Sequence, residues 1–185
     1  MEGLRVISGT ARGTKLNTLP GDDVIRPTTD RVKESIFNII QFSVKGAKVL
    51  DVFCGSGALG IEALSRGAVF CSFVDSNAGS LDIAGKNIKK THLEAYSKLN
   101  KSDFRQFFST NSQKYDIIFA DPPYASGFLK DFICDVERNG ALSDDGILIF
   151  EASADTKSFE GEQLFPARTA LYGKTKVLFY KHKGT

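Results

Sequence analysis

The sequence predicts an α/β protein built on a mostly parallel β-sheet. From Ala47 onward, short apolar runs of strand type alternate with helical patterns, which is the arrangement of βαβ units. The strand runs are almost continuously apolar, as expected when helices cover both faces of a sheet. Two further strand candidates near the end of the chain leave no room for a helix between them. We therefore predict a Rossmann-like sheet whose last strand is antiparallel.

Each expected element is set by its apolar spacing and by the turn residues that flank it. The expected strands are Lys48–Phe53, Val69–Val74, Tyr96–Asn100, Tyr115–Ala120, Gly146–Glu151, Gln163–Leu171 and Thr175–Lys181. The expected helices are Ala58–Arg66, Leu81–Lys90, Asp103–Phe108 and Phe128–Asn139. The last two strands form a hairpin because only a short glycine turn separates them.

The N-terminal part of the chain differs in pattern and is expected to cover the main domain. Residues 1–45 hold a hairpin and a helix within the same domain, and residues 46–185 hold the sheet. The hairpin joins two apolar strand candidates, Leu4–Ser8 and Lys15–Leu19, across a glycine-flanked turn. Arg12, in that turn, is a candidate for contact with RNA phosphates.

The stretch R-P-T-T-D-R, residues 26–31, is a proline-set turn that leads into a helix. Thr28 or Asp30 can cap this helix, which continues to about Phe42 at helical apolar spacing. The simpler interpretation is helix initiation, with an acid near the positive helix end. The functional interpretation is a turn that closes over a cofactor or a base, with Arg26 and Arg31 meeting phosphate.

Composition indicates one globular domain. The 185 residues are 42% hydrophobic and 25% charged, enough to bury a core. No apolar run approaches the roughly 18–20 residues of a membrane span, and the start lacks the pattern of a signal peptide. The three cysteines are widely spaced, so we expect neither disulfides nor a metal site, and we expect a reducing, cytoplasmic location.

Positive charge gathers in three regions although the net charge is only +2. The stretch 166–185 holds five cations and no acid, and lysines also crowd residues 86–101 and arginines the N-terminal segment. For each region alone a solvated surface is the simpler interpretation. Together they favour a face that contacts phosphates.

A glycine-rich loop follows the first long strand. In VLDVFCGSGALGIEAL, Val49 to Leu64, the pattern G-x-G-x-x-G is formed by Gly55, Gly57 and Gly60. Glycines at this point let the backbone turn sharply and approach a ligand closely. The pattern alone fits a dinucleotide, S-adenosylmethionine or only a tight turn between strand and helix.

Two acids at strand ends favour an adenosyl cofactor over a dinucleotide. Asp51 lies four residues before Gly55, where its carboxylate would repel a pyrophosphate but suit a ligand with an ammonium and a sulfonium. Asp75, 20 residues after Gly55, can accept hydrogen bonds from ribose hydroxyls. The simpler roles are a cap on the glycine turn for Asp51 and a cap on the next helix for Asp75.

Further residues beside these strand ends complete the expected cofactor site. Phe53 and Ser76 follow the two acids closely in sequence and are expected contacts. Asp103, after the third strand, can reach an adenine amino group, with Phe104 beside it. Helix capping explains Asp103 nearly as well.

The stretch FADPPYASG, residues 119–127, predicts a catalytic corner on the same sheet edge. The exocyclic amine of a base is a poor nucleophile because its lone pair is delocalised into the ring. Asp121 and the carbonyl of Pro122 can hold both amine hydrogens, while Pro122 and Pro123 preset the backbone direction. Tyr124 offers a ring on which an unstacked base can lie, so that methyl donor and amine are aligned for in-line displacement. The simpler interpretation is a rigid proline turn that closes a strand.

These motifs carry a resemblance to a known family. VISGTARGTKL, RPTTDRVKESIFNII, LDVFCGSGALGIEALSRGA and FADPPYASG closely resemble the bacterial methyltransferases of the RsmD type, which modify the N2 of one guanine in small-subunit (16S) ribosomal RNA. The resemblance extends to LYGKTKVLFYKH and so covers nearly the whole chain. R-P-T-T-D-R is its specific part, since many methyltransferases share the glycine loop and D-P-P-Y.

The resemblance implies a class I S-adenosylmethionine-dependent methyltransferase with a seven-stranded sheet. It implies S-adenosylmethionine as methyl donor, released as S-adenosylhomocysteine, and 16S rRNA in an assembling small ribosomal subunit as partner of a monomeric enzyme. By match, the catalytic box is Asp121 to Tyr124, and Asp51, Gly55, Gly57 and Asp75 contact the cofactor. Some relatives have phenylalanine where this chain has a tyrosine, and either ring can stack.

Two other classes of function remain open from sequence. An adenine-N6 DNA methyltransferase can hold its target amine with the same residues, Asp121 to Tyr124, which we call the acceptor box. However, 185 residues leave little room for a target-recognition segment. A non-catalytic RNA-binding module or a nucleotide-binding oxidoreductase can also carry a glycine loop of this kind.

Overall fold

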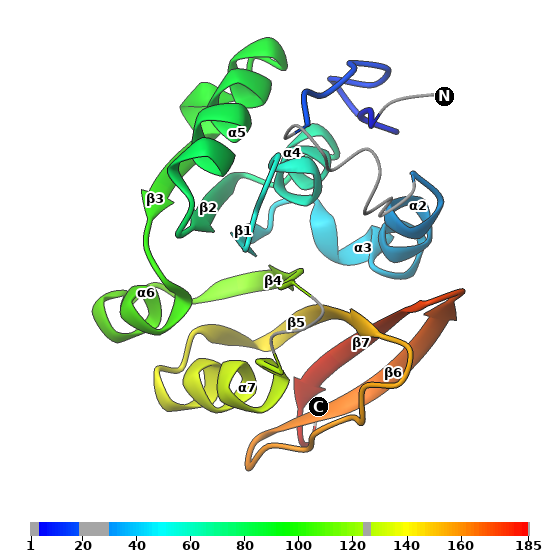
Figure 1. Cartoon of the computed structure of the whole chain (residues 1–185), viewed down its shortest axis with the longest axis vertical. Helices are drawn as coiled ribbons and strands as arrows, with labels where there is room; N and C mark the ends of the chain where they lie inside the picture. Colours follow the sequence, from blue (N-terminus) through cyan, green and yellow to red (C-terminus); the bar gives the residue numbers. More distant parts are fainter. Residues whose placement is uncertain (1–3, 19–29, 124–126, 185) are drawn as a thin grey trace.

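The computed structural model describes residues 4–18, 30–123 and 127–184. Seven strands within these ranges form one sheet (Figure 1). The strand order is β3-β2-β1-β4-β5-β7-β6. The strands are β1 Lys48–Val52, β2 Phe70–Asp75, β3 Ser97–Lys101, β4 Tyr115–Ala120, β5 Leu142–Ser153, β6 Leu164–Tyr172 and β7 Thr175–His182. Strands β1 to β5 pair in parallel, and β7 runs antiparallel to both β5 and β6. The predicted Rossmann-like sheet with an antiparallel last strand is confirmed.

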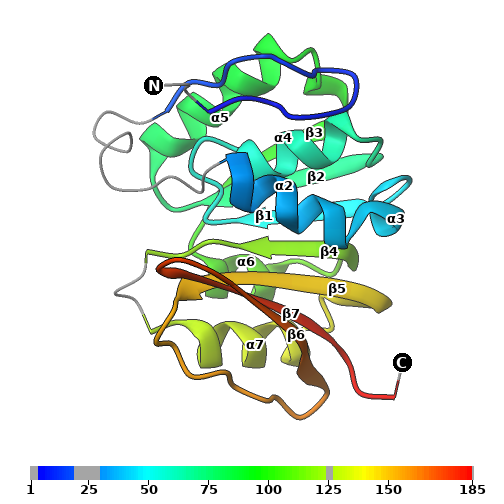
Figure 2. The same ribbon diagram turned by 90° about the vertical axis from the view of Figure 1, so that its right-hand side faces the viewer.

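Helices cover both faces of the sheet (Figure 2). One face carries α2 Asp30–Ile39, α3 Gln41–Val44, α4 Ala58–Ser65 and α5 Ala78–Lys90. The other face carries α6 Phe104–Thr110 and α7 Leu129–Arg138, and a 3-10 turn, η1 Glu94–Tyr96, precedes β3. The crossovers change faces between β3 and β4, so the strand order reverses between β1 and β4. Ligands of such sheets bind at the carboxyl ends of the strands at this switch point.

Two apolar clusters, one on each face of the sheet, form the core. Alternate residues of each central strand enter opposite clusters, which is why the strands read as almost unbroken apolar runs. The cluster under α6 and α7 is rich in phenylalanine, and Phe132 packs against the rings of Phe104, Phe108 and Phe150 at 5.4 to 5.6 Å between centroids. Aromatic contacts of this kind add to the stability that burial provides.

The N-terminal hairpin is present as a short antiparallel pairing, although its two segments do not form full strands. Arg5 and Lys15 form an antiparallel bridge, and the N–H groups of Leu16 and Val6 donate to the carbonyls of Leu4 at 2.8 Å and Thr14 at 3.0 Å. The N–H groups of Ile7 and Ser8 instead donate to the carboxylate of Glu62 in α4, at 2.7 and 3.0 Å. Side-chain acceptors of a distant helix therefore replace part of the strand ladder that local sequence favours.

The helix expected to continue to about Phe42 is interrupted. It ends at Ile39, and a single turn, α3, follows after Ile40. This change of direction buries both Ile40 and Val44, while Phe42 projects outward at 93% exposure. The proposed cap at Thr28 lies outside the described residues.

Several simpler expectations can also be compared with the structure. The three cysteines, Cys54, Cys71 and Cys134, are free thiols. Within residues 4–18, 30–123 and 127–184, no group of side chains is arranged to hold a metal ion. In the same ranges, no helix is both long enough and apolar enough to cross a membrane.

Candidate active site

The structure brings three predicted acids together at the switch point between β1 and β4. Asp51 lies near the end of β1, Asp75 ends β2, and Asp121 directly follows β4. The carboxylates of Asp121 and Asp75 both act electrostatically on Asp51. The carboxyl edge of the sheet therefore carries the carboxylates of Asp75 and Asp121 beside the buried Asp51, which suits a cationic ligand better than a pyrophosphate.

The three glycines of the loop after β1 have two different roles. Gly55 and Gly57 have φ of +54° and +78°, a left-handed conformation that favours glycine. A Cβ on Gly55 would meet nothing nearer than 4.0 Å, so open space lies in front of this turn. A Cβ on Gly60 would come within 2.4 Å of the Phe73 ring, so that glycine allows α4 to pack against β2. The first two glycines thus shape the loop, and the third permits close packing behind it.

Asp75 ties the end of β2 to the glycine loop. Its carboxylate accepts from the N–H groups of Gly55 at 3.0 Å and Asn77 at 2.8 Å. Asn77, not Asp75, caps α5, by accepting from Gly79 and Ser80. Each carboxylate oxygen can accept more than one hydrogen bond, so capacity for ribose hydroxyls remains. The neighbouring Ser76 is exposed.

Asp51 is buried, with only 2% of its surface exposed. Its Oδ2 accepts from the N–H of Gly60 at 2.9 Å, which is the turn-capping role. Burial raises the pKa of Asp51 to about 8; the Gly60 bond opposes this rise, and the carboxylates of Asp121 and Asp75 add to it. A bound cation would favour the ionised form, so the chemistry of the three acids and the open glycine turn fit S-adenosylmethionine.

Phe53 adopts a strained backbone conformation at the entrance to the loop. Its φ of 59° is left-handed, which costs a residue with a Cβ roughly 1–2 kcal/mol. The Phe53 ring stacks on Phe128 with centroids 6.0 Å apart and lies 5.5 Å from Phe104. Strain of this kind is frequent at functional sites.

Asp103 and Phe104 have structural roles, and their predicted cofactor contacts stay predictions. Asp103 accepts from the N–H of Arg105 at 2.9 Å and so caps α6, while its carboxyl group remains exposed. Phe104 is buried, and the Arg105 guanidinium lies 4.5 Å from the centre of its ring.

The described part of the acceptor box continues the sheet. The N–H of Asp121 points to the carbonyl of Val52 at 3.5 Å, so this residue extends the pairing of β4 with β1. Pro122 is buried and Pro123 is exposed. Tyr124, the predicted stacking ring, lies outside the described residues.

The predicted RNA contacts are not brought together in the described structure. Arg26 and Thr28 lie outside the described residues, and Arg31 is exposed in the first turn of α2. Arg12 is exposed in a turn whose N–H groups bond to Ser65, at the end of α4 remote from the glycine loop. Any contact between Arg12 and RNA would therefore lie about one helix length from the acids.

Asn87 supports the glycine loop and was missed from sequence. It is fully buried in α5, and its Nδ2 donates to the carbonyls of Ser56 at 2.8 Å and Asn17 at 3.0 Å. Its Oδ1 accepts from the N–H of Asn17 at 2.7 Å. One amide thus joins the N-terminal segment to the loop. The sequence offers one signal for this role, since a polar residue, Asn87, stands at a position on the apolar face of the predicted helix.

Glu62 was also missed, and it fastens the N-terminal segment and α2 to α4. Besides the two backbone donors of that segment, it pairs with Arg66 at 2.7 Å and lies 3.7 Å from the Nζ of Lys33. Lys33 is fully buried and also donates to the carbonyl of Arg5. Burial lowers the pKa of Lys33, against the opposing effect of Glu62 and Asp30. A charge network therefore attaches to α4 both the segment before residues 19–29 and the helix after them, α2.

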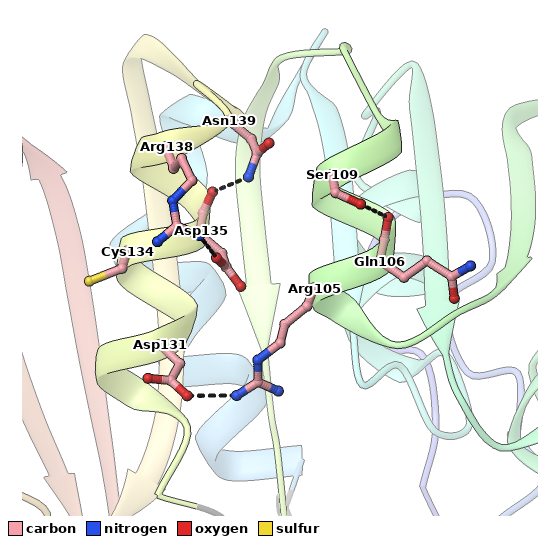
Figure 3. Close-up of a pocket in the computed structure, with 8 residues that line it drawn as sticks. All are labelled: Arg105, Gln106, Ser109, Asp131, Cys134, Asp135, Arg138 and Asn139. Carbon is pink, nitrogen blue, oxygen red and sulfur yellow. Dashed lines mark hydrogen bonds and ion pairs between the residues drawn. The ribbon is translucent and has the colours of Figure 1, made fainter.

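A wide groove of about 670 Å³ between α6 and α7 is separate from this corner (Figure 3). Its two arginines are each paired with an aspartate, Arg105 with Asp131 at 2.6 Å and Arg138 with Asp135 at 2.8 Å. The groove is lined by Arg105, Gln106, Ser109, Asp131, Cys134, Asp135, Arg138 and Asn139. Among the described residues, none of the glycine loop and neither Asp121, Pro122 nor Pro123 lines this groove, which therefore lies apart from the predicted chemistry.

The sheet order, the glycine loop at the switch point and the acids around it define a class I S-adenosylmethionine-dependent methyltransferase. More narrowly, the chain belongs to the family described as Conserved hypothetical protein 95, whose model matches residues 4–181. The predicted family and class of protein are confirmed.

Relatives of known name are similar over most of their length. The chain is 36% identical to "Putative rRNA methyltransferase YlbH" of Bacillus subtilis, over 98% of this chain and 100% of that protein. It is 34% identical to "Ribosomal RNA small subunit methyltransferase D" of Escherichia coli, over 91% and 82%. Among solved structures, "Putative methyltransferase yhhF" of Escherichia coli superposes with a TM-score of 0.87 at 31% identity, over 98% of each chain.

Proposed function

We propose that this protein transfers a methyl group from S-adenosylmethionine to the exocyclic N2 amine of a guanine in 16S ribosomal RNA. The observation that carries the proposal is the position of Asp121 and Pro122, directly after β4 and beside the glycine loop and Asp51. The relative in Escherichia coli is named for methylation of small-subunit ribosomal RNA, which supports the choice of substrate. The enzyme would act as a monomer on assembling subunits in the cytoplasm.

The cofactor would lie across the carboxyl ends of β1 and β2. When bound, S-adenosylmethionine supplies an electrophilic methyl group. Gly55 leaves open space in which the cofactor could approach the loop backbone closely, and Asp51 would face its positive charge. Asp75 would accept from the ribose hydroxyls, while Phe53, Ser76, Asp103 and Phe104 border the adenine end.

The acceptor box would activate the target amine. The carboxylate of Asp121 and the carbonyl of Pro122 each accept one amine hydrogen, which turns the nitrogen lone pair out of the plane of the base. Asp121 is also the acceptor for the proton that the amine loses. Pro122 and Pro123 fix the direction of the backbone, and Tyr124 stacks on the base.

The N-terminal unit, residues 1–45, would hold the RNA over this corner. Arg26, Thr28 and Arg31, in the stretch that leads into α2, would meet phosphate, and Arg12 would be a further contact. The Glu62–Lys33 network supports this role, because it fixes the chain on both sides of residues 19–29.

The proposal is tested by supplying labelled methyl donor to the protein with three substrates: naked 16S rRNA, small subunits that lack the modification, and double-stranded DNA. We expect one labelled nucleotide in RNA, identified by nuclease digestion and mass spectrometry as N2-methylguanine. Label in DNA adenine, or saturable binding of nicotinamide dinucleotide without binding of S-adenosylmethionine, would reject it.

A further inference from the structure

A second pocket, of about 200 Å³, lies directly beside the acceptor box. Its walls come from the box, from the start of α7 and from the loop between β5 and β6. They include Pro122, Pro123, Phe128, Lys130, Lys157 and Phe159.

The floor of the pocket lies mainly on the opposite side of the sheet from Asp51. Its floor includes Phe150 and Ala152, which belong to the apolar cluster under α6 and α7. Asp51 alternates with Leu50 and Val52 of that cluster, so its side chain points to the other face, where it senses Asp121. An amine held between Asp121 and the carbonyl of Pro122 would therefore lie at the rim of this pocket, and the volume lined by Phe128 and Phe159 is available to a second group.

Rings and cations together line the pocket. Phe128 and Phe159 are partly exposed, and the Nζ of Lys130 lies 5.8 Å from the centre of the Phe159 ring. Lys130 and Lys157 are exposed, and within the described ranges no acidic side chain forms an ion pair with either. The buried Glu151 also borders the pocket, and a carboxylate there would repel phosphate. Phosphates are therefore expected at the rim, beside Lys130 and Lys157.

The β5–β6 loop is fixed in place, so this pocket is preformed. The carbonyl of Phe159 accepts from the hydroxyl of Tyr180 at 2.8 Å, and that of Thr156 from the Nζ of Lys176 at 2.6 Å. At the end of the loop, the carboxylate of Glu137 accepts from the N–H of Leu164 at 2.7 Å. A fixed ring loses little freedom when it stacks on a ligand.

We propose that this pocket receives a nucleobase that neighbours the target guanine in the RNA, stacked on Phe159. The inference rests on the proposed function, because a guanine placed in the acceptor box must leave its own stack and its neighbours then lose a partner. Lys130 and Lys157 would contact the flanking phosphates, which the three acids at the strand ends repel. A ring, two cations and a small volume fit one base better than a protein segment.

The test combines changes in the RNA with changes in the pocket. RNA fragments that span the methylated guanine are made with one abasic nucleotide at each of the neighbouring positions. Their binding in the presence of S-adenosylhomocysteine is measured by fluorescence anisotropy. For the unmodified protein we expect one abasic position to weaken binding roughly tenfold, the scale of one lost base–aromatic stack. In Phe159→Ala that position should cause no further loss, whereas Phe159→Tyr should retain the discrimination.

Controls separate this pocket from general effects. Lys157→Gln should weaken the binding of all fragments by the same factor. Lys48→Gln, at the start of β1 and so at the opposite end of the strands from the pocket, should leave RNA binding unchanged. The inference is overturned if no abasic position weakens binding, or if the loss is as large in Phe159→Ala as in the unmodified protein. Failure of the proposed function appears elsewhere, as absence of N2-methylguanine in the labelling experiment.

Discussion

Asp121 is the residue on which the chemistry depends most directly, because it provides one of two acceptors for the amine. We expect Asp121→Ala to reduce single-turnover methyl transfer by roughly 10²–10³, the effect of losing one positioned polar group. Cofactor binding, measured by calorimetry, should remain close to that of the unmodified protein. Asp116→Ala, at the opposite end of β4, is the matched control and should leave turnover unchanged. Near-normal transfer in Asp121→Ala would remove the role assigned to it.

Asp51 makes cofactor binding depend on pH. In the folded protein its pKa is about 8, so at neutral pH the group is largely protonated, and a bound cation would favour loss of that proton. Affinity for S-adenosylmethionine should therefore rise with pH up to about 8, by at most about tenfold per pH unit. Calorimetry in buffers of different ionisation enthalpy would detect the released proton. Asp51→Asn should bind more weakly and without this pH dependence; a pH-dependent affinity that persists in Asp51→Asn would contradict the assignment.

The same group limits the stability of the free protein. The pKa of Asp51 is raised above the ordinary value of 3.8, so between about pH 4 and 8 the folded state holds a proton that the unfolded chain has lost. Its contribution to stability is therefore fully present below pH 4 and decreases as pH rises through this window. The buried Asp51 therefore lowers the free energy of unfolding at neutral pH, and we attribute its position to binding of the cationic cofactor.

At the scale of elements, the glycine loop depends on α5 as well as on β1. Asn87→Ala would remove the bonds to Ser56 and Asn17 and leave these partly buried backbone groups without their side-chain partner. We expect a loss of roughly 1–3 kcal/mol in the free energy of unfolding and weaker binding of S-adenosylmethionine. Denaturant unfolding and calorimetry measure the two effects.

A matched asparagine separates loop support from helix stability. Asn139 donates only to the carbonyl of Asp135 in its own helix, α7, at 2.9 Å. Asn139→Ala should therefore leave cofactor binding unchanged. Equal cofactor affinity in Asn87→Ala and the unmodified protein would show that the loop holds its shape without α5.

At the scale of the whole molecule, charge is divided between an acidic site and basic surfaces. The acids gather at the carboxyl ends of β1, β2 and β4, whereas exposed lysines and arginines lie on the helices and on the β6–β7 hairpin. Some of these cations already have partners: Lys86 pairs with Asp82, and Lys183 with Glu160. Other exposed cations, such as Lys174 at the tip of the β6–β7 hairpin, are available to phosphates although the net charge is only +2.

This distribution predicts salt-dependent RNA binding. The logarithm of the RNA affinity should fall linearly with the logarithm of salt concentration, by about 0.7 per phosphate contacted on a single strand. Lys174→Gln, at the exposed tip of the β6–β7 hairpin, should reduce this slope, and Lys86→Gln should not. Filter binding from about 50 to 300 mM salt measures the slope, and an affinity independent of salt would contradict a phosphate-contacting surface.

Much of the fold could be predicted because its signals are local. The strand Tyr115–Ala120 was predicted to the residue, since an apolar run ends at an acid followed by two prolines. The strand after α7 begins four residues earlier than expected, at Leu142, because pairing of Leu142 with Tyr115 extends it. The helix α5 also begins earlier than expected, at Ala78, because Asn77 caps it.

By itself, the sequence determined the order of strands and helices, the glycine loop and the corner after β4, because apolar period, glycine and proline act within a few residues. Only the tertiary structure decided that the N-terminal segment bonds to Glu62 and that Asn87 supports the glycine loop. These contacts join residues 55 and 70 positions apart, where no local pattern relates the partners. The high pKa of Asp51 has the same origin, because it arises from burial and from carboxylates that distant strands bring to one edge.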